Sequence, residues 1–160
     1  MLSDQHMLAS LKPEGSMAVV VPLAMLFGRP TAPLRRLLLE DDLIECVVRL
    51  GPRLFHETAI PAVILVVNRN KPIERQGKVL LVDSRDELTK RSSNQNTLST
   101  DNISRIVHAF RRFQDDDPFC RVVSIDEIRT NDHELTVPLY VPKPPPIQAD
   151  VVPISDLCSI

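Results

Sequence analysis

Two apolar runs joined by a short polar segment limit what this chain can fold into. Residues 43–50 and 60–67 each have the length of a buried strand and are rich in β-branched side chains, which favour a pleated sheet. The joint between them, residues 51–59, is too short for a crossover helix, so the two strands should be antiparallel neighbours. The joint carries a single aromatic side chain, Phe55.

The remaining pattern alternates helices with strands and predicts an α/β fold. Apolar residues spaced three and four apart predict an amphipathic helix over residues 100–113, capped by Thr100 or Asp101. Shorter signals predict further helices at residues 1–12 and after Thr31, and further strands at residues 17–21, 79–82 and 122–125. We expect a mobile loop at 85–99, a turn at 126–132 and a weakly ordered, proline-rich tail at 141–160.

Composition indicates a soluble cytoplasmic domain. The chain has 160 residues, 43% of them hydrophobic, which is enough for a core of its own. A net charge of −2 argues against a free-standing nucleic-acid binder but is compatible with a subunit of a larger nucleic-acid enzyme. Cys46, Cys120 and Cys158 are odd in number and widely spaced, which is typical of unpaired thiols in a reducing compartment. No signal peptide or membrane span is predicted.

No motif in the sequence defines a catalytic, cofactor-binding or metal site. The glycines are isolated, and HExxH, CxxC and GxSxG patterns are missing. The acidic run at residues 115–117 is typical of a solvated helix end, with a metal cluster as the alternative. Arg111 and Arg112 are candidates for contact with a DNA backbone, although a solvated helix face explains them as well. Phe55, beside Arg53, could stack on a base or could be a core residue.

The order of several short stretches resembles the methylation subunit of type I restriction–modification systems. These stretches are LKPEG at 11–15, VVVP at 19–22, LFG at 26–28, RLFHETAIP at 53–61, NRN at 68–70 and EIRTNDHEL at 127–135. The resemblance implies a Rossmann-like sheet of a DNA adenine N6-methyltransferase that uses S-adenosylmethionine. It assigns residues 17–21, 43–50 and 60–67 to the last three strands of that sheet, with the final one antiparallel and inserted between the other two.

The resemblance also implies what the chain lacks. In the family, a glycine-containing cofactor loop and an Asn-Pro-Pro-aromatic catalytic motif precede the matching stretches, and neither is in this sequence. We therefore expect the C-terminal half of a catalytic domain, inactive alone. Residues 1–83 would form this half of the sheet, 84–140 a loop, helix and extension, and 141–160 the tail.

The expected partners follow from the same resemblance. They are DNA, the missing N-terminal half, and the specificity and restriction subunits of a type I complex, with no membrane involved. Phe55 would contact the target adenine, and Arg53, Arg111 and Arg112 would be possible backbone contacts. Two alternatives remain open: a non-catalytic assembly module that binds the specificity subunit through residues 100–113 and the tail, and an unrelated small α/β ligand-binding domain.

Overall fold

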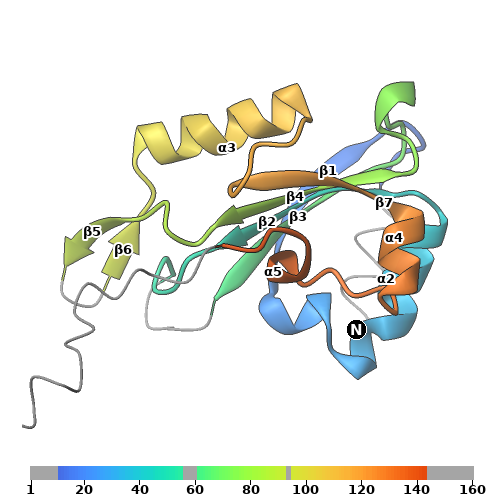
Figure 1. The fold of residues 1–160 in the computed structure, drawn as a ribbon, viewed down its shortest axis with the longest axis horizontal. Helices are drawn as coiled ribbons and strands as arrows, with labels where there is room; N and C mark the ends of the chain where they lie inside the picture. The colour runs from blue at the N-terminus through green and yellow to red at the C-terminus, as the bar shows by residue number, and fades with distance from the viewer. Residues whose placement is uncertain (1–10, 56–60, 93–94, 144–160) are drawn as a thin grey trace, which may run out of the picture.

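A five-stranded sheet forms the centre of the molecule in the computed structural model, which describes residues 11–55, 61–92 and 95–143 (Figure 1). Its strands stand in the order β1-β3-β2-β4-β7. Their bounds are Ser16–Pro22 for β1, Ile44–Leu50 for β2, Ala62–Asn68 for β3, Lys78–Ser84 for β4 and Cys120–Ser124 for β7. The mixed α/β class predicted from the sequence is confirmed.

Strand β3 lies between β1 and β2 and runs antiparallel to both. Ile64 at its centre pairs with Val20 on one side and with Val48 on the other. The hairpin predicted from the two apolar runs is therefore confirmed, and so is the inserted antiparallel strand that the resemblance implies. Strand β4 pairs with β2 in parallel, and β7 closes that side as an antiparallel edge strand.

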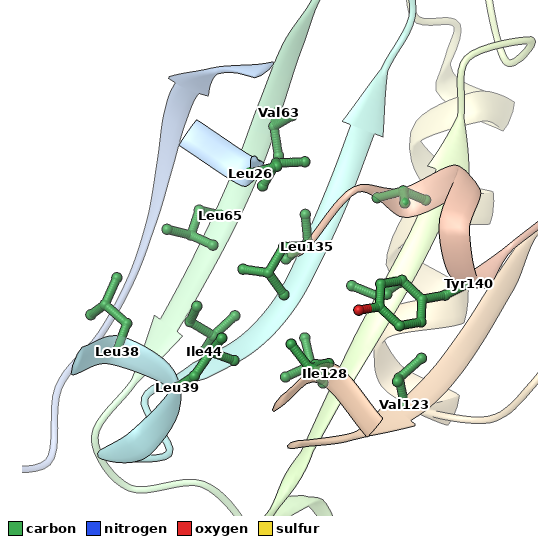
Figure 2. Close-up of a cluster of buried hydrophobic side chains, with 14 of the residues drawn as sticks. Leu26, Leu38, Leu39, Ile44, Val63, Leu65, Val123, Ile128, Leu135 and Tyr140 are labelled. Carbon is green, nitrogen blue, oxygen red and sulfur yellow. The ribbon is translucent and has the colours of Figure 1, made fainter. Parts of the chain in front are cut away.

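One face of the sheet carries the larger core (Figure 2). It is covered by the short helix η1 (Leu23–Leu26) and by the helices α2 (Ala32–Glu40), α4 (Ile125–Thr130) and α5 (Val137–Tyr140). Figure 2 shows their side chains meeting those of the strands, among them Leu26, Leu38, Leu39, Ile128 and Tyr140 with Ile44, Val63, Leu65 and Val123. Because successive side chains of a strand point to opposite faces, only alternate residues of each strand reach this core.

The opposite face is covered in part by one long helix, α3 (Thr100–Arg112). Ala109 is buried on it, against a cluster that includes Val48, Leu80 and Val82. The cap is Ser99 and not Thr100 or Asp101: its hydroxyl accepts the Asn102 N–H, and the Asn102 side chain accepts the Ser99 N–H. This reciprocal pair satisfies two backbone donors that a helix start leaves without partners.

Two predictions of irregular structure are wrong. The segment expected as a mobile loop contains a two-stranded hairpin, β5 (Thr89–Ser92) and β6 (Gln95–Thr97). The expected turn at 126–132 is largely helix α4, which begins because the Ser124 hydroxyl accepts the Glu127 N–H. The short helices η2 (Arg29–Thr31) and η3 (Ile73–Arg75) complete the fold. Most of the predicted first helix, and the tail beyond residue 143, lie outside the described residues.

A buried arginine joins the segments beneath the larger core. Arg35, which is 3% exposed, donates to the carbonyl oxygens of Met25, Gly28 and His133 and to the hydroxyl of Thr31. A buried charge is tolerated only where its hydrogen bonds are satisfied, and these bonds tie α2 to η1 and to the segment after α4.

In the part of the chain that the structure describes, no helix is long and apolar enough to cross a membrane.

The packing of α2 predicts a sharp contrast between two leucines that lie two positions apart. Leu39 is fully buried, whereas Leu37 is 54% exposed. Leu39→Ala should lower the free energy of unfolding by about 2–5 kcal/mol, because it removes buried methyl groups and leaves a cavity. Leu37→Ala is the matched control and should change it by less than about 0.5 kcal/mol. Urea denaturation of the two variants measures both values, and equal losses would contradict this account of the core.

Candidate nucleic-acid interface

The carboxyl ends of three parallel strands meet at one edge of the sheet. Strands β1 and β2 are each antiparallel to β3 and hence parallel to each other, and β4 is parallel to β2. They end at Pro22, Leu50 and Ser84. In open α/β sheets this carboxyl edge is where ligands bind, because the loops that follow the strands gather there. Residues 51–55, which we call the tip loop, follow β2 at this edge.

Phe55 is the last residue of the tip loop, and 42% of its surface is exposed. It belongs to neither of the two core clusters, which argues against the alternative that makes it a core residue. Leu54 is different, because it packs against the cluster beneath α3. The loop is thus anchored by one apolar side chain while the next one remains accessible. His56, which follows, lies outside the described residues.

The tip loop is held against the segment that follows β4. A Cβ atom on Gly51 would come within 2.5 Å of the Arg85 carbonyl oxygen and 2.4 Å of a Leu88 methyl carbon, so the two backbones approach as closely as glycine allows. Asn96 of β6 makes two bonds to the loop: its backbone N–H donates to the Arg53 carbonyl at 2.9 Å, and its side-chain amide donates to the Pro52 carbonyl at 2.9 Å.

A cluster of charges lies beside this loop at the end of β4. The buried carboxylate of Asp83 accepts from the Arg85 guanidinium at 2.6–3.0 Å, and Lys143 pairs with Asp86 at 2.6 Å. Burial acts to raise the pKa of Asp83, but the hydrogen bonds from Arg85 outweigh it and hold the pKa below its ordinary value. Asp83 is therefore ionised at neutral pH. Arg85 balances the charge of Asp83, and the pair fixes the position of the chain where it leaves β4.

The predicted backbone contacts are divided between two ends of the molecule. Arg53 is exposed in the tip loop beside Phe55. Arg111 and Arg112 lie in the last turn of α3, a helix roughly 20 Å long. The Arg111 carbonyl accepts from Arg75 of η3, which directs that end of the helix toward the amino end of β4. Arg53 and Phe55 thus share the tip loop, and the structure separates both from Arg111 and Arg112.

The hairpin β5–β6 is the part of this site that the sequence analysis missed. It carries the exposed Lys90, the strand partner of Asn96, on the side of β6 that faces away from the tip loop. Its residues are polar and show no alternation of apolar side chains, so neither periodicity nor composition marks them as strands. The only local signal is the cap of α3, since Ser99 and Asn102 form a recognisable pair just after the hairpin.

The acidic run after α3 is part of the local backbone structure. The Asp115 carboxylate accepts the Val122 N–H at 2.8 Å, and the Asp116 carbonyl accepts the N–H groups of Phe119 and Cys120. Among the described residues, no three His, Cys, Asp or Glu side chains are grouped so that they could hold a metal ion.

Cys46 and Cys120 are buried free thiols, and burial raises the pKa of Cys120 to about 11.

Comparisons with known proteins agree on one family. The model of the family described as N-6 DNA Methylase matches residues 4–146. The methylase subunit of the type I restriction enzyme MjaVIII from Methanocaldococcus jannaschii is 41% identical over 140 residues, which are 86% of this chain and 24% of that protein. The methylase subunit of the HindI enzyme from Haemophilus influenzae is 32% identical over 145 residues, 86% of this chain and 32% of that protein.

A solved structure shares both the fold and the sequence pattern. The methyltransferase subunit of a type I restriction–modification system from Streptococcus thermophilus superposes with a TM-score of 0.78 at 33% identity, and the match covers 85% of this chain and 29% of that one. This chain therefore spans about a quarter to a third of the length of these relatives.

The close approach at Gly51 predicts a position-specific effect. Gly51→Ala should destabilise the protein by about 1–3 kcal/mol, because the new methyl group forces the tip loop away from Arg85 and Leu88. Amide chemical shifts of residues 51–55 and 85–88 should change together. Gly77→Ala is the control: it places a side chain at a φ of +69° but contacts nothing within 4 Å. It should cost about 1 kcal/mol and leave those shifts in place. Unchanged shifts in Gly51→Ala would contradict the contact.

Proposed function

Since this chain belongs to the N-6 DNA methylase family, we propose that it supplies the distal part of the catalytic domain of a type I restriction–modification methylation subunit. When complete, that domain transfers a methyl group from S-adenosylmethionine to adenine N6 in DNA. On this proposal residues 1–83 continue the methyltransferase sheet, residues 84–140 extend it, and residues 141–160 form a tail. The complete subunit works in the cytoplasm with DNA, a specificity subunit and a restriction subunit.

The open edge of β1 is the observation that carries this proposal. Within the described residues, β1 pairs with β3 on one side, and no strand pairs with its other side. Ala18 and Val20 are exposed, and they share one face with their partners Val66 and Ile64. The exposed fraction of Val20 is 51%. We call these four residues the open strip.

An open edge beside an apolar strip fits a sheet that continues into another segment. Unpaired backbone groups on a strand favour the addition of a further strand, and the open strip offers apolar surface to a helix that covers the joined sheet. The partner that fits both features is the N-terminal half of the methyltransferase domain. That half would supply the cofactor loop and the Asn-Pro-Pro-aromatic motif, so the present chain alone would not methylate DNA.

Phe55 is assigned to the extruded target adenine. An enzyme that modifies a base in duplex DNA must first remove the base from the stack, and an aromatic side chain can replace a lost stacking neighbour. The exposure of Phe55 at the carboxyl edge supports this role. Arg53 would contact the DNA backbone beside the target base. Arg111 and Arg112, at the far end of α3, would meet a more distant part of the DNA.

A chimera tests the proposal directly. The N-terminal part of the Methanocaldococcus methylase subunit, up to its matched region, would be fused to this chain. We expect the chimera to transfer methyl groups from radiolabelled S-adenosylmethionine to adenine in DNA when the specificity subunit is present. This chain alone should transfer none. A chimera that folds and binds DNA but does not methylate it, or methylation by this chain alone, would contradict the proposal.

The open edge predicts association of the isolated chain. Size-exclusion chromatography with light scattering should show a mass that rises with concentration. Val20→Lys should reduce this rise, because a lysine on an exposed edge strand opposes pairing with another strand. Leu37→Lys is the matched control, since Leu37 is equally exposed but lies on α2, and it should associate like the unmodified chain. A monomer at all concentrations would contradict the open-edge interpretation.

Base stacking predicts a loss of activity without a loss of stability. In the chimera, Phe55→Ala should weaken the fluorescence increase of 2-aminopurine at the target position and slow methylation, since stacking on an aromatic ring contributes about 1–3 kcal/mol per base. The melting temperature should hardly change. Phe55→Trp should retain most of both signals. Ile73→Ala, which truncates an exposed side chain ahead of β4, is the control. Collapse of the fold in Phe55→Ala would make Phe55 a packing residue.

A further inference from the structure

We infer that Asn96 is a positioning residue that holds the tip loop, and Phe55 with it, in the conformation that meets the target base. The inference rests on the proposed function, and it adds a residue from a different segment of the chain. Asn96 lies 41 positions beyond Phe55, yet it donates two hydrogen bonds to carbonyl oxygens of the tip loop. Both distances are 2.9 Å, the usual length for an amide donor and a carbonyl acceptor.

The tip loop needs an external support because it cannot be fixed by its own backbone. Arg53 has a φ of +59°, in the left-handed region that residues other than glycine rarely adopt. A loop with such a residue exchanges easily with other conformations unless its surroundings hold it. The two bonds from Asn96 end on the carbonyls of Pro52 and Arg53, on both sides of the Arg53 nitrogen and Cα. They therefore fix the peptide groups that set this unusual conformation.

Asn96 can serve as a support because its own hairpin is anchored to α3. Glu87, ahead of β5, accepts from Asn102 at 3.2 Å and forms an ion pair with Arg105. Asn102 in turn forms the cap of the helix with Ser99, two residues beyond the end of β6. Leu98 and Leu54 pack against the same apolar cluster beneath the helix. A rigid helix thus holds the hairpin, and the hairpin holds the loop.

Prepositioning of this kind affects the reaction rate. A stacking side chain contributes to catalysis only in the fraction of molecules where it stands in the productive place, and a preorganised loop increases that fraction. Loss of one ordinary hydrogen bond corresponds to about a fivefold to tenfold change in a conformational equilibrium. We therefore expect a rate effect of that size from the side-chain amide of Asn96, without direct contact between Asn96 and the substrate.

The first experiment measures loop order in the full chain without DNA. The sequence contains no tryptophan, so Phe55→Trp creates a single fluorescent reporter in the loop. In that background, Asn96→Asp keeps the size of the side chain but replaces the amide donor by a carboxylate oxygen. Time-resolved anisotropy should then show a larger amplitude of fast motion at residue 55. Gln95→Glu is the matched control, since it makes the same change at the neighbouring residue of β6, which pairs with Ser92.

The second experiment uses the chimera with unmodified Phe55. Asn96→Asp should lower kcat by about fivefold to tenfold and weaken the 2-aminopurine signal. It should leave the KM for S-adenosylmethionine and the melting temperature unchanged, which a general loss of structure would not do. Asn96→Gln, which keeps an amide donor, should recover part of the rate. Gln95→Glu should behave like the parent.

The outcomes distinguish this inference from the proposed function. If residue 55 is equally ordered in Asn96→Asp and its parent, or if Gln95→Glu has the same effect, Asn96 is not a positioning residue. If Asn96→Asp leaves kcat unchanged while Phe55→Ala lowers it, the inference fails and the proposed function stands. If neither substitution affects base extrusion or rate, the assignment of Phe55 fails and the positioning role fails with it.

Discussion

The structure depends on the insertion of β3 between β1 and β2. Both edges of β3 are hydrogen-bonded, so its register fixes the positions of both neighbours. Val63, Leu65 and Val67 then reach the larger core, while Ile64 and Val66 point to the opposite face. A shift of one residue would exchange these two sets, so the apolar pattern specifies a single register. Within the described residues, the same strand order leaves the outer edge of β1 without a partner strand, and the end of β2 brings the tip loop to the carboxyl edge of the sheet.

The elements that could be predicted are those in which a local pattern of apolar residues indicates which side chains are buried. The two apolar runs around residues 51–59 predicted antiparallel neighbours, and the spacing of apolar residues predicted α3. The hairpin β5–β6 was missed because its stability comes from contacts outside the hairpin, with the tip loop far away in the sequence and with α3, which follows it. Helix α4 was missed because it is short and depends on one cap, Ser124. Tertiary contacts decide such segments, and propensity does not.

The candidate site also has a part that the sequence could indicate and a part that only the structure gives. The accessibility of Phe55 could be anticipated from its position in a polar joint, but pattern alone left a core role equally open, and the observed exposure was needed to decide. The separation of Arg53 from Arg111 and Arg112 follows from the direction of α3 across the sheet, which a one-dimensional sequence does not give. Asn96 has no local signature, because a polar residue in a polar segment acquires its role only from the carbonyl groups that the fold brings to it.

Under the proposed function, the edge of β1 that has no partner strand among the described residues has a thermodynamic consequence for the chain in a cell. Surface that is buried only on assembly contributes nothing to the stability of the unassembled chain, so part of the folding free energy is supplied by binding. A partner present at a hundred times its dissociation constant adds about 2.7 kcal/mol to apparent stability by mass action. Copies produced in excess of the partner lack this contribution, and proteases that degrade unfolded chains remove them first. If the proposed partner pairs with β1, the strand edge ties the amount of surviving chain to the amount of that partner.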